Sequence, residues 1–130
     1  MAILQWMGKF SIWRIKRSGV DIRAKNNRYG VYFLIETKGE GSDKSKSLRS
    51  QQETHFIYGL GQLITRMNVS RGQYQYGLGF PESIAKIAIR RIPYQIATKL
   101  RLNIFSVNSD GIVARYQAGD LRKHQTKKDE

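Results

Sequence analysis

The segment over residues 31–39, VYFLIETKG, most constrains the fold, because an apolar, partly β-branched run ends in an acid and a lysine two residues apart. Such a run predicts a β-strand. Since alternate side chains of a strand share a face, we expect Glu36 and Lys38 to lie on the same side of a sheet at the end of this strand. An acid and a lysine in that position can hold a metal ion and a water molecule.

A second carboxylate lies upstream of this strand. Asp21 belongs to a short apolar segment, residues 20–24, which we predict to be another strand. The residues between the two strands include the turn-forming sequence NNRYG at 26–30. Two strands joined by a short turn would bring Asp21 and Glu36 close together.

The remaining pattern predicts a single α/β domain over residues 1–116. We expect three antiparallel strands first and then a polar loop over residues 39–50. A main helix, a strand, two helices opened by prolines and two final strands should follow. Residues 117–130 are polar and basic, and we expect them to form a flexible tail. The expected strands are 10–17, 20–24, 31–38, 73–80, 102–107 and 112–116, and the expected helices are 51–67, 81–91 and 93–100.

The main helix has two distinct stripes when it is projected at 100° per residue. We expect its apolar stripe to face the core, and the members of that stripe are Phe56, Leu60, Leu63, Ile64 and Met67. A polar stripe borders it, formed by His55, Gly59, Gln62 and Arg66. We expect Gln62 to point towards Asp21, Glu36 and Lys38, with His55 or Arg66 near a bound phosphate. The alternative is that the polar stripe is ordinary solvated helix surface.

The chain has a net charge of +13, from 23 lysines and arginines against 10 acids. Such a field favours a polyanion, and phosphate contacts supply affinity without sequence information. A solvated basic surface, or attraction to ribosomes or membranes, is the alternative interpretation. The residues that we expect to contact nucleic acid are Arg14, Lys16, Arg17, Arg23, Lys25, Lys44, Lys46, Arg49, His55 and Arg66.

Several classes of protein are excluded by composition. The chain has no cysteine, which excludes disulfides, thiolate zinc sites and cysteine nucleophiles, and its two histidines cannot form a histidine-rich metal site. No apolar run reaches the ~18 residues of a membrane span, and no signal-peptide pattern opens the chain. We therefore expect a cytoplasmic protein that does not enter a membrane.

An Asp, a strand ending in Glu-x-Lys and a helix with Gln together resemble the PD-(D/E)XK nuclease superfamily. The resemblance extends from about residue 20 to residue 107 and includes GVD at 19–21, IETKG at 35–39 and GQLI at 61–64. It implies a restriction endonuclease-like α/β core, with a mixed central sheet of about five strands flanked by helices. It also implies a metal-dependent nuclease that acts on DNA rather than RNA and uses Mg²⁺ or Mn²⁺.

The resemblance also implies roles for individual residues. Asp21 and Glu36 would ligate the metal ion together with the backbone carbonyl of Thr37. Lys38 would orient or activate the water molecule, and Gln62 matches a glutamine that some members hold beside the active site. Such nucleases often act as dimers, because a duplex has two strands, so a two-fold homodimer is expected.

The chain departs from the superfamily in two respects. Members with the helix glutamine often have an aromatic residue four positions later, where this chain has Arg66. Many members also contribute an acid from an N-terminal helix, whereas no Asp or Glu precedes Asp21 here, and Glu40 or Glu53 would have to substitute. Two alternatives to an active enzyme follow. The chain could be a catalytically inactive nucleic-acid-binding module of the same fold, or a subunit that needs a partner to complete its site.

Overall fold

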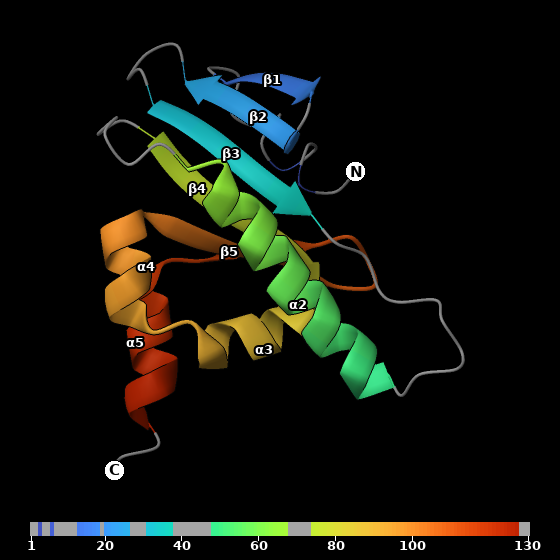
Figure 1. Ribbon diagram of the computed structural model, residues 1–130, viewed down its shortest axis with the longest axis vertical. Coiled ribbons are helices and arrows are strands. Elements are labelled where there is room, and N and C mark those ends of the chain that lie inside the picture. The colour runs from blue at the N-terminus through green and yellow to red at the C-terminus, as the bar shows by residue number, and fades with distance from the viewer. Residues whose placement is uncertain are drawn as a thin grey trace.

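The computed structural model contains one mixed six-stranded sheet with helices packed against it (Figure 1). The strands follow one another across the sheet in chain order, from β1 to β6. The structure describes the backbone of residues 3, 6, 13–18, 20–26, 31–37, 48–67 and 74–127, and the side chains of residues 3, 6, 35, 37, 48–67 and 74–127.

The sheet contains both antiparallel and parallel strand pairs. The first three strands pair antiparallel, β4 lies parallel to β3, β5 lies parallel to β4, and β6 returns antiparallel to β5. A parallel pair requires a crossover, and here α2 connects β3 to β4 while α3 and α4 connect β4 to β5. The strands are β1 (Trp13–Ser18), β2 (Val20–Asn26), β3 (Val31–Thr37), β4 (Tyr74–Pro81), β5 (Leu102–Val107) and β6 (Val113–Tyr116), and the helices are α2 (Leu48–Thr65), α3 (Glu82–Arg91), α4 (Tyr94–Leu100) and α5 (Ala118–Thr126).

A mixed α/β sheet flanked by helices was expected, and this prediction is confirmed. The sheet has six strands rather than about five, and the side chains of three of them, β4, β5 and β6, are described in full. Element boundaries predicted from the sequence agree within three residues, and β5 begins and ends where predicted. The expected loop over residues 39–50 lies outside the described residues up to position 47, and α2 already begins at Leu48.

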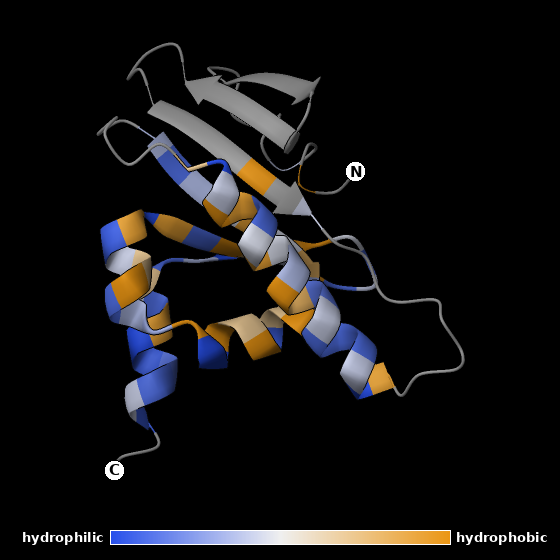
Figure 2. Ribbon diagram, in the orientation of Figure 1, coloured by the Kyte–Doolittle hydropathy of each residue, from blue (hydrophilic) through white to orange (hydrophobic). Residues whose placement is uncertain are grey.

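The core lies between the sheet and the helices α2 and α3. Tyr76, Leu78 and Phe80 of β4 are at most 2% exposed, which confirms that this face of the strand belongs to the core. The Phe80 ring meets the ring of Phe56 edge-on, at a centroid distance of 6.3 Å. Apolar residues concentrate along α3 and β5, whereas α5 is largely hydrophilic (Figure 2).

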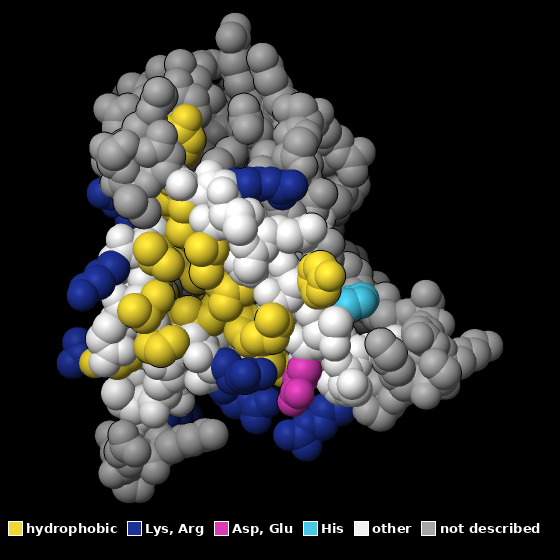
Figure 3. All heavy atoms as spheres, viewed as in Figure 1, with side chains coloured by type: hydrophobic (Ala, Val, Ile, Leu, Met, Phe, Trp, Pro, Cys, Tyr) yellow, Lys and Arg dark blue, Asp and Glu magenta, His cyan; other side chains and the backbone are white. Residues whose placement is uncertain are grey.

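The apolar stripe predicted for α2 is partly wrong. Phe56 and Leu63 are buried, but Ile64 is 48% exposed. The helix packs through a narrow seam that includes Gly59, so the residue directly after Leu63 is turned about 100° away from the sheet. Apolar side chains also gather on the surface of the molecule that faces the viewer in Figure 3.

The opposite face of the sheet is covered by the N-terminal residues that the structure describes. Ile3 is 2% exposed, and Trp6 meets Phe105 edge-on at a ring-centroid distance of 5.4 Å. A β-carbon on Gly77 would lie 2.8 Å from the Phe105 ring, and one on Gly79 would contact Ile3. The two glycines thus allow these side chains to approach the sheet closely.

The flexible tail that we predicted for residues 117–130 is wrong over most of its length, because α5 occupies Ala118–Thr126. Gln117 and Asp120 form a reciprocal capping box at its start, and Leu121 is 1% exposed. The Gln125 side chain donates to the carbonyls of Ile89 (2.9 Å) and Ile92 (2.6 Å) and accepts from the Tyr94 amide (3.2 Å). The helix is thus held by polar contacts, which a hydropathy pattern does not reveal.

Within the described part of the chain, no helix has both the length and the apolar composition needed to cross a membrane.

Candidate functional site

The β2–β3 ladder ends directly beside the two predicted carboxylate positions. Ile22 pairs with Ile35, and Arg23 pairs with Leu34. The same antiparallel register, continued by one residue, sets Asp21 opposite Glu36, and both residues lie within their strands. Directly opposite positions share a face of the sheet and have β-carbons roughly 4.5–5.5 Å apart.

The strand pairing also identifies the face on which this pair lies. Glu36 pairs with Leu78 of β4, and Leu78 belongs to the core cluster that includes residues of α2 and α3. The Asp21 and Glu36 positions are therefore on the helix-covered face of the sheet. Thr37 has the opposite parity, and its side chain lies beside Gly79. Its backbone carbonyl was the third predicted ligand. Lys38 lies outside the described residues.

Gln62 lies near the level of Glu36 along the sheet. Figure 1 shows that α2 runs opposite to β3 and β4, and the Phe56–Phe80 contact fixes it against β4. Gln62 follows Phe56 by six positions, or about 9 Å of helix axis. Since a strand rises about 3.3 Å per residue, this distance corresponds to about three residues back from Phe80, near the Glu36 partner Leu78.

The Gln62 side chain carries an unusual feature. It is half-buried, and its Oε1 atom is buried without a hydrogen-bond partner among the residues that the structure describes. Such an acceptor normally costs stability of about 1–3 kcal/mol, and it marks a position where a donor, a water molecule or an ion would be favourable. That Gln62 points towards Asp21, Glu36 and Lys38 stays a prediction, because those side chains are not among the ones described.

Basic residues of the first hairpin face each other across the strands. Arg14 of β1 pairs with Lys25 of β2, and Lys16 pairs with Arg23. Like charges directly opposite one another are destabilising. Arg23 and Lys25 also share the parity of Asp21, so this basic ladder lies on the same face as the carboxylate pair. Arg17 belongs to β1 at the point where the register shifts.

The other residues predicted to contact nucleic acid are more scattered. Arg49 is exposed at the start of α2 and pairs with Glu53 at 3.6 Å. His55 is half-buried, and Arg66, which follows α2, is exposed. Lys44 and Lys46 lie outside the described residues.

A polar network around the buried side chain of Asn103, on the opposite face of the sheet, was missed by sequence reasoning. The Asn103 Nδ2 atom donates to the Tyr76 and Arg101 carbonyls and to Gln75 Oε1, and Arg115 Nε donates to Asn103 Oδ1 at 2.9 Å. Burial lowers the pKa of the Arg115 guanidinium, although arginine remains protonated at neutral pH. The network joins β4, β5 and β6. Asn103 alone within an apolar strand was the available signal.

The described side chains contain no group of three or more acids and histidines that could hold a metal ion. The side chains of Asp21 and Glu36 are not among those described, so this statement does not cover a metal site built on them. Carboxylate and carbonyl oxygens are the ligands that Mg²⁺ and Mn²⁺ prefer, so two acids and the Thr37 carbonyl fit such an ion by donor type.

No protein-family model and no curated protein matches this chain. Two solved structures are similar to it. An XisH family protein from Nostoc punctiforme PCC 73102 is 16% identical, with a TM-score of 0.45 over 84% of this chain and 91% of that chain. An fdxN element excision controlling factor protein from Anabaena variabilis is 19% identical, with a TM-score of 0.42 over 82% of this chain and 88% of that chain. At these values neither likeness assigns a fold or a function to the chain.

Proposed function

We propose that this protein is a metal-dependent nuclease of the PD-(D/E)XK type that hydrolyses phosphodiester bonds in DNA. The observation that carries the proposal is the β2–β3 register, in which Ile22 pairs with Ile35; one further residue of the same register would set Asp21 opposite Glu36. The basic ladder on the same face and the net charge of +13 favour a polyanionic substrate.

In this proposal each residue has a separate task. Asp21, Glu36 and the Thr37 carbonyl hold Mg²⁺ or Mn²⁺, which supplies Lewis-acid stabilisation of the charge that develops on phosphate. Lys38 orients the attacking water molecule. Gln62 Oε1, a buried acceptor without a partner among the described residues, would accept a hydrogen bond from that water molecule. The hairpin cations Arg14, Lys16, Arg23 and Lys25 bind backbone phosphates.

Cleavage of plasmid DNA tests this proposal. We expect activity with Mg²⁺ or Mn²⁺ that EDTA abolishes, and we expect Glu36→Ala and Lys38→Ala each to lower the rate by orders of magnitude, because each removes a group that the reaction requires. Asp110→Ala removes an exposed acid from the β5–β6 turn and should cleave like wild type. Equal nicking by wild type, Glu36→Ala and Lys38→Ala would contradict the proposal.

A second candidate is a subunit that requires a partner to complete its site. No acid precedes Asp21 in the chain, and the helix face exposes Ile57, Ile64 and Ile96 at 51%, 48% and 44%. Ile57 and Ile64 are seven positions apart on α2 and therefore share one face of that helix, and an exposed apolar face is typical of an interaction surface. Light scattering of the purified protein would separate a self-associating chain, which is the expected two-fold dimer, from one that stays monomeric and inactive until a partner is added.

A further inference from the structure

A basic hollow with a volume of about 1000 Å³ lies where α2, α3, β6 and α5 meet. We call it the α3 groove and define it by the side chains that carry the argument: Arg49, Lys86, Arg90, Arg91, Tyr116 and His124. Glu53 is the one acid among its lining residues. Four permanent cations therefore oppose a single carboxylate.

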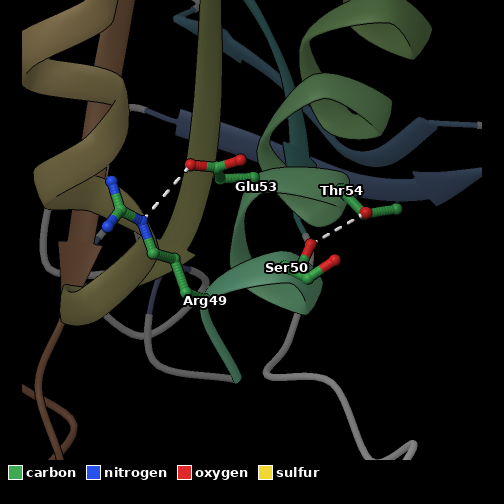
Figure 4. Close-up of polar contacts among 4 residues, drawn as sticks. All are labelled: Arg49, Ser50, Glu53 and Thr54. Carbon is green, nitrogen blue, oxygen red and sulfur yellow. Dashed lines mark hydrogen bonds and ion pairs between the residues drawn. The ribbon is translucent and has the colours of Figure 1, made fainter. Parts of the chain in front are cut away.

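The cations of the α3 groove are available to a ligand. Arg49 pairs with Glu53 at 3.6 Å (Figure 4), and Lys86 pairs with Glu82 at 3.9 Å. All four of these side chains are about half exposed or more, from 47% to 86%, and such exposed pairs contribute little stability. Arg90 has no acidic partner within the described part of the chain.

Arg91 is held in position by an aromatic ring. Its guanidinium carbon lies 5.4 Å from the centroid of Phe56, and it has no acidic partner among the described residues. This contact orients the side chain while leaving its hydrogen-bond donors free for an anion.

Stabilisation of the helix end does not account for the groove. Arg90 and Arg91 occupy the last turn of α3, where cations are favoured by the helix dipole. Lys86 lies one turn earlier, and Arg49 comes from the first turn of a different helix, so the dipole of α3 explains neither. The Tyr116 and His124 rings, 5.9 Å apart edge-on, line the same hollow and offer flat surfaces beside the cations.

We propose that the α3 groove binds the phosphodiester backbone of the DNA substrate at a distance from the Asp21–Glu36 pair. This inference rests on the proposed function for its substrate. Arg49 precedes Gln62, which lies near the level of Glu36, by 13 positions, or about 20 Å along the axis of α2. With a backbone charge every ~3.4 Å along each strand, the groove contacts phosphates about six nucleotides from the cleaved bond.

The chemistry of the groove favours a nucleic-acid backbone over other anions. Guanidinium forks match phosphate oxygens in a bidentate geometry. A concave site is shielded from a flat membrane surface, and the cations of this one come from two helices, α2 and α3.

Binding of a fluorescent DNA duplex, measured in EDTA at several salt concentrations, tests the proposal without cleavage. The double variant Arg90→Gln/Arg91→Gln should raise Kd at least about tenfold and reduce the salt slope by roughly two, since two phosphate contacts are lost. The control is Lys99→Gln/Lys123→Gln, which removes the same charge from exposed positions outside the groove and should leave the slope unchanged. Equal losses in both double variants would overturn the proposal.

Two further measurements keep the result specific. Arg90→Gln alone avoids the Phe56 contact, so it should weaken binding while thermal unfolding stays at the wild-type temperature. If inorganic phosphate bound the groove but duplex DNA did not compete, the proposal would be overturned. If the wild-type protein binds DNA through Arg90 and Arg91 but never cleaves it, the nuclease proposal is contradicted and the groove proposal is supported. If the Arg90→Gln/Arg91→Gln variant binds and cleaves DNA like wild type, the groove proposal is contradicted and the nuclease proposal is supported.

Discussion

Gly77 has no room for a side chain, because its β-carbon position is enclosed by buried neighbours. A β-carbon there would lie 2.8 Å from Phe105 Cε2 and 3.0 Å from Ile35 Cγ1, and both of these side chains are fully buried. The close fit keeps β3, β4 and β5 packed beneath the N-terminal residues, next to the strand end that carries Glu36.

Gly77→Ala should destabilise the protein by about 1–3 kcal/mol, because overpacking forces the Phe105 ring or the strand to move. Gly61→Ala is the matched control, since nothing lies within 4 Å of its β-carbon position in α2. That change should stabilise the protein by about 0.5–1 kcal/mol through helix propensity. Chemical denaturation measures both changes, and equal effects of the same sign would contradict this account of Gly77.

At the scale of elements, α5 shows where sequence reasoning failed. Its apolar burial depends on Leu121, and Gln125 joins it to the connection between α3 and α4. A periodic apolar pattern predicted the buried strands, α3 and most of α2, because burial there follows hydropathy. The pattern carries no signal for a helix that is capped by Gln117 rather than by Ser or Thr and is anchored by an amide side chain.

Gln125→Ala should lower the free energy of unfolding by about 1–3 kcal/mol, because the carbonyls of Ile89 and Ile92 lose their donor. Gln95→Ala, on the exposed side of α4, serves as the control and should change stability by less than about 0.5 kcal/mol. Thermal or urea unfolding would decide the matter. A neutral Gln125→Ala would mean that the hydrogen bonds of this amide do not stabilise the docking of α5.

The basic residues of the β1–β2 hairpin should lower the stability of the fold and strengthen DNA binding. Lys16 faces Arg23 across the ladder, so Lys16→Gln removes a like-charge repulsion and should stabilise the protein by about 0.2–1 kcal/mol. The same change should weaken DNA binding, since a phosphate contact is lost. Lys123→Gln on α5 is the control for the change in net charge. If Lys16→Gln altered neither the melting temperature nor the DNA affinity, the basic ladder would have no role in binding.

For the whole molecule, the net charge and the strand register support the proposed function through different observations. The net charge of +13 predicts a polyanionic partner from composition alone. The sheet then adds what composition cannot supply, because one further residue of the β2–β3 register would bring Asp21 and Glu36 opposite one another although they are 15 positions apart. Sequence could predict that these two strands pair, since a short turn joins them. It could not predict the α3 groove, whose cations come from elements that are distant in the chain.

The central claim is that Asp21 and Glu36 hold a divalent metal ion, and anomalous diffraction from crystals soaked in millimolar Mn²⁺ tests it most directly. The account predicts an Mn²⁺ peak between the two carboxylates, with oxygen ligands at about 2.0–2.3 Å, that disappears in Asp21→Asn/Glu36→Gln. Soaked wild-type crystals with no peak at this pair, or with peaks that persist unchanged in the double variant, would contradict the claim.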